Sequence, residues 1–245
     1  MSPSVTSGCY TKDLSKAPSL SGGASCCTTY EFVAPDDVVF YRIVETKYDG
    51  ADYGYIAEIY ELGFHSQDDF IEPHIECLRD EGLSDEQITS EILKLELVDE
   101  DKTILVARFA YDPINFLDPN QQQVSGIQIR GAFVRDESSG VGLAGQIYRQ
   151  LVYIHGHLVS DNVQTECGAA LWSGTIRDVV GRVDIYDYAA QKYIEELGND
   201  GIGVYGYVPW DLDSAENPHI FKSGRWTKYP FQVETCRHIV LIVSR

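Results

Sequence analysis

The spacing of apolar positions changes between residues 126 and 153, which predicts a strand followed by a helix. Ile127 and Ile129 alternate with polar or small residues, as in a strand that buries one face. From Leu143 onward the apolar residues recur every three or four positions, as on one face of a helix. Gly140 and Gly142 lie between the two patterns, so we expect a short glycine-bearing loop to join the elements.

The residues before this segment predict an arm, strands and two helices. Residues 1–28 are rich in Ser, Thr, Gly and Pro, and predict a flexible N-terminal arm. Residues 30–45 are β-branched and aromatic enough for one or two strands, and residues 47–55 predict a turn. Ser66 and Ser84 each begin a capping sequence, Ser-x-x-Asp and Ser-x-x-Gln, so each predicts the start of a helix.

The second half of the chain predicts a mixed sheet. Residues 103–111 are almost entirely apolar, as in a central strand, whereas residues 112–123 predict a surface loop. We further expect strands at 158–159, 182–187 and 238–243, helical segments at 164–176 and 188–197, and an aromatic loop at 201–218. This order favours an α/β (α+β) fold, a mixed sheet with helices on both faces.

Composition limits the size, partners and location of the protein. The 245 residues, 44% of them hydrophobic, suffice for one large domain with its own core. A net charge of −19 argues against binding nucleic acid through a basic patch. A solvated acidic surface explains this charge most simply, and a basic partner or cationic amine substrate is the alternative. No apolar run approaches ~18 residues and the N-terminus is polar, so neither a membrane span nor a signal peptide is expected.

The six cysteines show no pattern typical of a metal site. They lie at positions 9, 26, 27, 77, 167 and 236, without any Cys-x-x-Cys pair. Their spacing matches no zinc site, so we expect no metal and predict reduced thiols in a cytoplasm.

The glycine-bearing loop has a chemical consequence if a helix follows it. The first N–H groups of a helix are unpaired and carry partial positive charge, so such a loop can hold a phosphate or pyrophosphate. Gly140 and Gly142 would let the ligand approach the backbone, because glycine has no Cβ. A plain turn between strand and helix explains the same residues.

Two stretches resemble the GCN5-related N-acetyltransferase (GNAT) superfamily. Glu137-Ser-Ser-Gly140-Val-Gly142-Leu-Ala144 is similar to its pyrophosphate loop, whose usual pattern is Arg/Gln-x-x-Gly-x-Gly/Ala. Ser160-Asp161-Asn-Val-Gln164-Thr165, followed by Trp172, resembles the Ser-Asp-x-x-Gln-Thr…Leu-Trp pattern of such proteins encoded by tailed bacteriophages. The likeness covers about residues 124–187. Glu137 departs from it, because the family usually has Arg or Gln there.

The resemblance implies a domain plan and a cofactor. A GNAT-like, mostly antiparallel sheet would occupy residues 29–245, with a variable part at 29–120, an acyl-CoA-binding core at 121–190 and a C-terminal loop and strand at 191–245. The implied cofactor is acetyl-CoA. Its pyrophosphate would bind backbone groups of Ser139, Gly140, Val141, Gly142, Leu143 and Ala144. Its pantetheine arm would pair with Ala132, Phe133 and Val134, for which ordinary sheet pairing is the alternative.

The resemblance also implies catalytic roles. Ser160 or a water molecule would protonate the leaving thiolate, and Asp161 or Glu166 would accept the amine proton. Trp172 occupies the position of the family's general acid, although an indole N–H has no useful acidity. Asp161 has a structural alternative as a turn cap. Gln164 and Thr165 would contact the acceptor, and Thr165 has helix capping as its alternative.

Two functions of different classes remain open from the sequence. The first is an acyl-CoA-dependent N-acetyltransferase, of the kind that phages encode, which modifies a host protein, a modified nucleotide or a small amine. The second is an inactive GNAT-like scaffold that serves as a virion component or binds a host protein. The expected partners are therefore an amine acceptor, a host protein or a second copy of the chain, in the host cytoplasm or in the virion.

Overall fold

Two long strands, β5 (Val98–Leu117) and β6 (Gln123–Val134), contribute residues to two compact units. The structure is a computed structural model that describes residues 4–6, 14–17, 22–35, 37–65, 68–138, 142–198, 200–212 and 238–245. Unit 1 comprises Met1–Asp13, Tyr111–Gly131 and Gly140–Arg245, and unit 2 comprises Leu14–Ala110 and Ala132–Ser139. Each unit is described by itself below.

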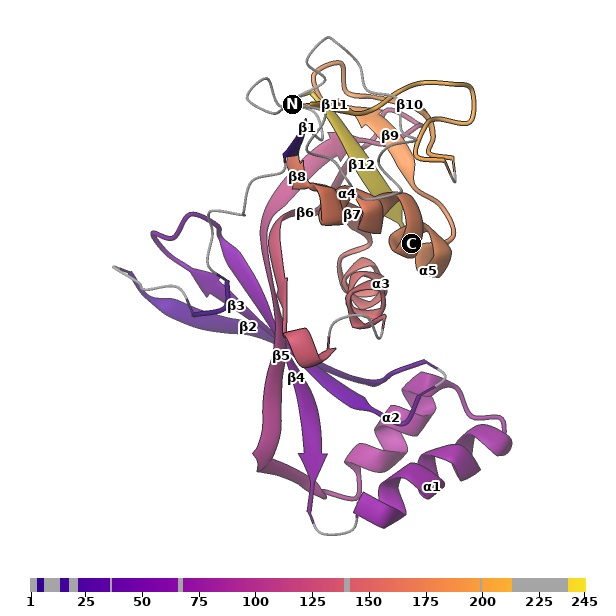
Figure 1. Cartoon of the computed structure of the whole chain (residues 1–245). Helices are drawn as coiled ribbons and strands as arrows, with labels where there is room; N and C mark the ends of the chain where they lie inside the picture. The colour runs from indigo at the N-terminus through magenta and orange to yellow at the C-terminus, as the bar shows by residue number, and fades with distance from the viewer. Residues whose placement is uncertain are drawn as a thin grey trace. The chain divides into compact units, whose positions relative to one another are not determined.

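Unit 2 is built on antiparallel strands. Its strand order is β6-β5-β4-β3-β2, in which β2 (Ala24–Val33), β3 (Phe40–Tyr48) and β4 (Tyr55–Phe64) pair antiparallel in sequence order. Helices α1 (Asp68–Asp80) and α2 (Asp85–Leu93) follow β4 and lie beside each other (Figure 1). The predicted strands at 30–45 and the turn at 47–55 are thereby confirmed.

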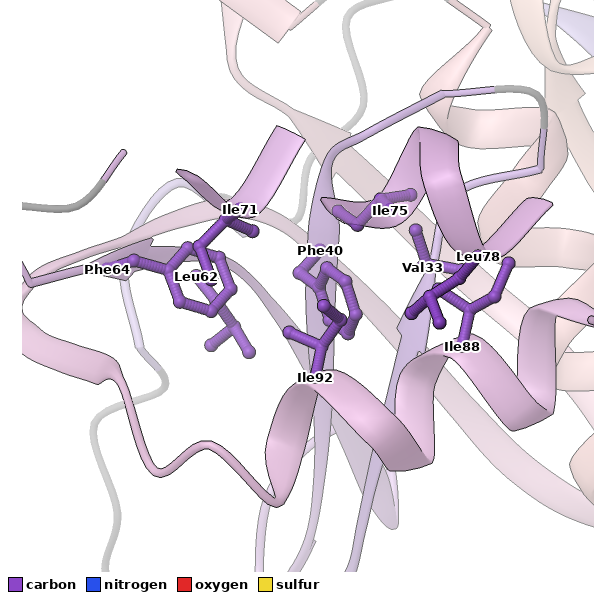
Figure 2. Close-up of a cluster of buried hydrophobic side chains, with 9 residues drawn as sticks. All are labelled: Val33, Phe40, Leu62, Phe64, Ile71, Ile75, Leu78, Ile88 and Ile92. Atoms are coloured by element: carbon purple, nitrogen blue, oxygen red, sulfur yellow. The ribbon is translucent and has the colours of Figure 1, made fainter. Parts of the chain in front are cut away.

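The core of unit 2 forms where these two helices pack on the strands. Figure 2 shows side chains of both helices directed toward Phe40. The cluster consists of Val33, Phe40, Leu62, Phe64, Ile71, Ile75, Leu78, Ile88 and Ile92. Burial of this apolar surface fixes the helices to the sheet, because each helix has its apolar residues on one face. The ring of Phe64 meets Phe40 edge-to-face at 5.8 Å.

Unit 1 contains the strand–helix segment predicted from apolar spacing. Helix α3 (Leu143–His155) connects β6 to β7 (His157–Val159), which lies parallel to β6. The strand order is β10-β9-β12-β7-β6-β5, with β9 (Asp184–Asp187), β10 (Lys192–Glu196) and β12 (Ile239–Ser244) joined by antiparallel pairing. Phe116, Val159, Tyr186, Val240 and Ile242 form a core cluster of this unit. The coarse prediction of a mixed fold with a mostly antiparallel sheet is confirmed.

A small parallel sheet completes the described part of unit 1. Strand β1 (Ser4–Thr6) pairs with both β8 (Val163–Thr165) and β11 (Asp211–Leu212). Two stretches inside the expected flexible arm therefore have regular structure, since β1 lies within residues 1–28 and β2 begins at Ala24. The expected boundary at residue 28 coincides with neither unit.

The helix expected at 164–176 continues further than its sequence indicated. Helix α4 (Glu166–Leu171) passes into a π-helix, η2 (Trp172–Ile176), and then into α5 (Arg177–Val180). Gly174 does not end the segment. Gly181 ends it instead, with a left-handed φ of 88° that glycine adopts without steric cost.

Two other expectations are wrong. Residues 112–117 continue strand β5 rather than forming a loop, because Phe116 is buried in the core cluster of unit 1. Residues 192–196 form strand β10 rather than a helical turn. In β10, Tyr193 packs edge-to-face on Tyr186 of β9 at 5.0 Å, and the Asp187 carboxylate accepts the N–H of Ala190 in the connecting turn. Strand β4 was not anticipated at all.

Candidate functional site

Ser160, the first residue after β7, is fully buried and its polar groups are used inside the fold. Its backbone N–H donates to the Leu241 carbonyl at 2.8 Å, and its hydroxyl accepts the Leu241 N–H at 3.0 Å. The same hydroxyl donates its proton to the Asp161 carbonyl at 3.1 Å. Ser160 therefore anchors the end of β7 to β12, and its one proton is already committed.

The loop that follows is held by a side chain of β6. The Gln128 amide nitrogen donates to the Ser160 carbonyl at 3.0 Å and to the Asn162 side-chain oxygen. Gln128 lies between Ile127 and Ile129, each only 4% exposed, and projects from the opposite face of the strand. A polar side chain at this alternating position thus braces residues 160–162, which we call the Asp161 loop.

Arg130 brings positive charge to the same loop. It lies two residues beyond Gln128, and therefore on the same face of β6. Its guanidinium lies 3.4 Å from the Asp161 carboxylate and 3.5 Å from that of Asp112, through Nη1 and Nε respectively. The Asp161 carboxylate also accepts the Asn162 N–H at 2.8 Å, so the predicted turn-capping role of Asp161 is present.

Gln164 completes what we call the Asp161 cluster. This cluster comprises Asp112, Gln128, Arg130, Asp161, Asn162 and Gln164. Gln164 is 5% exposed, and its amide nitrogen donates to the Asp161 carbonyl at 3.4 Å. Its side-chain oxygen is buried and accepts no hydrogen bond from any residue that the structure describes.

The start of helix α3 is not capped by a side chain of the described residues. Gly142 occupies the N-cap with φ 83°, without a side-chain cap hydrogen bond, and the first turn contains no acidic residue. A Cβ on Gly142 would meet nothing within 4 Å. Leu143 points into the core, 1% exposed, and Ala144 is half-buried, so both would act only through their backbone. The other predicted loop residues, Ser139, Gly140 and Val141, lie outside the described residues.

The predicted pantetheine strand belongs to unit 2. Ala132 is exposed, whereas Phe133 and Val134 are half-buried. Phe133 packs on a core cluster of Leu14, Tyr53, Ile56 and Ala110. Its side chain therefore has a packing role, and a cofactor would contact only the backbone of this segment.

Strand β7 follows β6 for a short distance. The parallel pairing joins Ile127 to Leu158 and Gln128 to Val159. Beyond Val159 the chain no longer pairs with β6. The Gln128 side chain instead donates to the Ser160 carbonyl and to the Asn162 side chain. Strand β6 continues to Val134, so much of its length extends past this pairing.

Trp172, predicted in the general-acid position, lies in the core of unit 1. It is 2% exposed and meets Tyr148 of helix α3 edge-to-face at 5.8 Å. It begins the π-helix η2, where the next residue, Ser173, donates its hydroxyl to the Ala169 carbonyl at 3.0 Å. The structure thus brings Ser160 and Asp161 together in one loop and gives Trp172 a packing role.

Sequence reasoning did not anticipate Gln128, Arg130 or Asp112 as neighbours of Asp161. One signal was present, because Gln128 and Arg130 are polar residues that alternate with the apolar Ile127 and Ile129. Their partner could not be inferred, since Asp161 follows them by about thirty residues and its loop is positioned by pairing with β12.

Two further features, a metal-binding cluster and a membrane-spanning helix, are absent from the described residues. No three His, Cys, Asp or Glu side chains among them are grouped so as to hold a metal ion. In the part of the chain that the structure describes, no helix has the length and apolarity needed to cross a membrane. Comparison with protein-family models, with curated proteins and with solved structures finds no match to this chain.

Proposed function

We propose that this protein is an acyl-CoA-dependent N-acetyltransferase with a GNAT-like sheet. The observation that carries the proposal is the β6–α3–β7 connection. It joins two adjacent parallel strands through a helix whose first residue follows an open, left-handed glycine. Parallel neighbours require such a crossover, but an uncapped helix start at its entrance is a feature that favours a bound anion.

The residues at the start of α3 fit a pyrophosphate. The chain has 38 acidic residues, yet none lies in the first turn of this helix. The partial positive charge of the helix start is therefore left for a ligand. Bound acetyl-CoA would supply an acetyl group as a thioester, while the backbone N–H groups after Gly142 would hold its pyrophosphate.

The Asp161 cluster would supply the acceptor side of the reaction. Asp161 is the residue we assign to the amine proton, because its carboxylate is partly exposed and lies in the loop after β7. Ser160 is less suited than a water molecule to donate a proton to the leaving thiolate, because its hydroxyl proton is already donated to the Asp161 carbonyl. A water molecule is therefore our choice for protonating the leaving thiolate.

A second function is favoured by a specific observation. Trp172 is packed against Tyr148 at the position where the resemblance places a general acid. An inactive scaffold that binds acyl-CoA, or that uses the fold to bind another protein, needs no acid at that position. Turnover separates this function from the transferase, whereas cofactor binding does not.

Calorimetry with acetyl-CoA tests the cofactor site. We expect micromolar affinity, which corresponds to about −8 kcal/mol. Gly142→Trp should abolish binding by filling the open helix start. Gly156→Trp is the matched control, because Gly156 ends the same helix with φ 77° and equally open space around a Cβ. Absence of heat with the wild-type protein, or equal loss in both variants, contradicts the site.

Thiol release from acetyl-CoA, measured with a set of amines, then tests the chemistry. We expect an amine-dependent rate in the wild type and its loss in Asp161→Asn, which retains an acceptor oxygen for the Asn162 N–H. Cofactor binding without any amine-dependent release would establish the scaffold function instead.

A further inference from the structure

Strand β2 is the last strand in the order of the large sheet, so no strand that the structure describes lies along its outer edge. One hydrogen bond shows which backbone groups face that edge. The Val33 N–H donates at 3.0 Å to the Thr89 hydroxyl of helix α2 and therefore points away from β3. Because backbone groups alternate in direction along an antiparallel strand, those of Thr29 and Glu31 point the same way.

The open part of this edge lies between two interruptions. Helix α2 closes the edge at Val33. The pairing with β3 shifts register between Cys26 and Thr28, as in a β-bulge, so the regular alternation ends there. Between these limits, outward N–H and C=O groups remain at Thr29 and Glu31.

This edge lacks the side chains that usually protect an exposed strand. Strand β2 contains neither Pro nor Lys. Its single charged residue, Glu31, pairs with Arg42 of β3 at 2.7 Å, and its side chain is 23% exposed. Residues 17–30 form the longest stretch of the sequence without Asp, Glu, Lys or Arg. Two copies of a chain with a net charge of −19 repel each other, and the repulsion is smallest where an uncharged strand forms the contact.

The open edge is complementary to itself in one register. Identical strands that pair across a two-fold axis run antiparallel. If Thr29 of each copy lies opposite Glu31 of the other, each such pair exchanges both N–H···O=C bonds, and Tyr30 lies opposite Tyr30. A register with the two Glu31 residues opposite each other would juxtapose like charges and would need the N–H of Val33, which already donates to Thr89.

Tyr30 supplies the side-chain contact in this register. Its ring stacks on Phe32 at a centroid distance of 6.2 Å, and Phe32 meets Tyr41 of β3 at 5.7 Å. These rings form a row across the two strands that ends at the half-buried Tyr30. Residues in a pair without mutual hydrogen bonds have the closer side chains, so two tyrosines there add an aromatic contact.

We propose that β2 binds β2 of a second copy of this chain in antiparallel pairing, with Thr29 opposite Glu31 and Tyr30 opposite Tyr30. A two-fold contact uses the open edge of both copies, so the assembly ends at a dimer and does not extend into a fibre. The paired stretch is short, and we expect a dissociation constant of roughly 10 μM to 1 mM. This proposal does not depend on the acetyltransferase activity.

Sedimentation equilibrium of the full-length chain measures the association. We expect the average mass to rise from 27.4 kDa towards twice that value as the protein concentration approaches about 1 mM. A mass that stays at the value of the monomer over this range would overturn the proposal. This measurement on the wild type needs no variant.

Charge variants at two exposed positions of β2 test the register. Thr29→Glu places a carboxylate opposite Glu31 of the other copy, twice in each dimer, and should weaken association by at least about tenfold. Ser25→Glu is the matched control, because it adds the same charge to the same strand outside the paired stretch, and should change association less than about threefold. Thr29→Lys should associate at least as tightly as the wild type. Equal weakening by both Glu variants, or weakening by Thr29→Lys, contradicts the register.

An intermolecular disulfide reports the register directly. In a background in which the exposed Cys26, Cys27 and Cys77 are Ser, Tyr30→Cys should crosslink two copies in oxidised glutathione, which is reduced to two thiols as the S–S bond forms. Opposed Cα atoms at such a position are about 4.5 Å apart, within disulfide range. Ser25→Cys is the control, because antiparallel pairing separates its two copies by roughly 33 Å. Equal crosslinking in both variants and in the background, or none in Tyr30→Cys, would refute the pairing.

Discussion

At the scale of single residues, Arg108 shows how unit 2 holds a charge in its interior. Arg108 is 8% exposed and donates to the Glu58 carboxylate at 2.8 Å. It also donates to the carbonyls of Leu14 and Ser15, at 3.2 and 2.9 Å. Tyr60 donates to the same carboxylate, and burial, with the negative charge of Glu58, raises the pKa of Tyr60 to about 12. Tyr60 therefore stays protonated over the neutral range and remains a hydrogen-bond donor to Glu58.

Removal of the Arg108 guanidinium should be strongly destabilising. Arg108→Met leaves the partly buried Glu58 carboxylate without its cation, and we expect a loss of about 3 kcal/mol in the free energy of unfolding. Urea denaturation measures it. Lys94→Met is the control in the same unit, because Lys94 pairs with Glu91 on the exposed face of α2 and should cost less than about 1 kcal/mol.

The double variant Arg108→Met with Glu58→Gln decides the cause. It removes the orphaned charge, so it should be more stable than Arg108→Met alone. Equal or greater destabilisation of the double variant would assign the effect to packing rather than to charge.

His157 provides a pH-dependent prediction. Burial lowers the pKa of His157, and the Asp118 carboxylate opposes this effect only in part. The half-buried ring contacts Phe116 edge-to-face at 5.3 Å, and its Nδ1 lies 2.9 Å from the Ser244 hydroxyl. Because the unfolded chain binds the proton more readily, the stabilising contribution of a neutral His157 is present above pH ~6.5 and is lost as the pH falls below that value.

Urea denaturation at pH 8 and pH 5.5 measures this contribution. His157→Gln should lose less stability than the wild type between the two pH values, since glutamine has no proton to gain. Parallel losses would contradict a lowered pKa. A titration of the His157 ring by NMR with a midpoint above 6.5 would do so directly.

At the scale of elements, helix α2 is the case in which local sequence and structure agree most fully. The Ser84 hydroxyl accepts the Gln87 N–H at 3.4 Å, and the Gln87 side chain accepts the Ser84 N–H at 2.9 Å. The reciprocal capping was predicted from four residues, because both bonds form within one turn. The stabilising effect of this cap on α2 does not depend on distant parts of the chain.

Loss of this cap should shift the stability of unit 2 modestly. Ser84→Ala removes the acceptor for one of the unpaired N–H groups, and we expect a cost of about 1 kcal/mol in urea denaturation. Ser90→Ala, at an exposed position of the same helix, is the control and should change stability by less than about 0.5 kcal/mol. A similar loss in both variants would show that helix propensity rather than capping is being measured.

The approach of β6 to β7 depends on another local feature, the missing side chain of Gly126. A Cβ at Gly126 would lie 2.7 Å from the Cβ and the carbonyl oxygen of His157. Gly126→Ala should therefore push the parallel strands apart and destabilise unit 1 by about 1–3 kcal/mol. Gly23→Ala, where a Cβ would meet nothing within 4 Å, is the control. Unchanged stability of Gly126→Ala would show that the strands separate without cost.

At the scale of the whole molecule, segments distant in sequence form each unit. Residues 4–6 supply strand β1 to unit 1, whereas Leu14 is buried in unit 2. The carbonyl of Leu14 accepts a hydrogen bond from Arg108 there. The composition of the first 28 residues predicted an arm, because they contain few large apolar groups. Composition does not report backbone pairing, and β1 joins its sheet through backbone hydrogen bonds that require no particular side chain.

The same limit applies to the candidate site. The positions of the glycine before α3 and of the strand on either side follow from spacing, and the structure confirms those elements. The Asp161 cluster could be predicted only as a loop with suitable residues. Its members come from β5, from β6 and from the chain after β7, and their proximity is set by strand pairing over long sequence separations.

By itself, then, the sequence determined the local elements: the strand at β6, the apolar face of α3, the terminal strand and the cap of α2. Each depends on residues within one or two turns, so periodicity and hydrogen-bonding chemistry are sufficient. The tertiary structure determined which residues, distant in sequence, became neighbours in space. The Ser160 hydroxyl accepts the N–H of Leu241, 81 residues away, and Gln164 is buried with a side-chain oxygen that accepts no hydrogen bond from the described residues. Burial and register arise from contacts between distant segments, which no local pattern encodes.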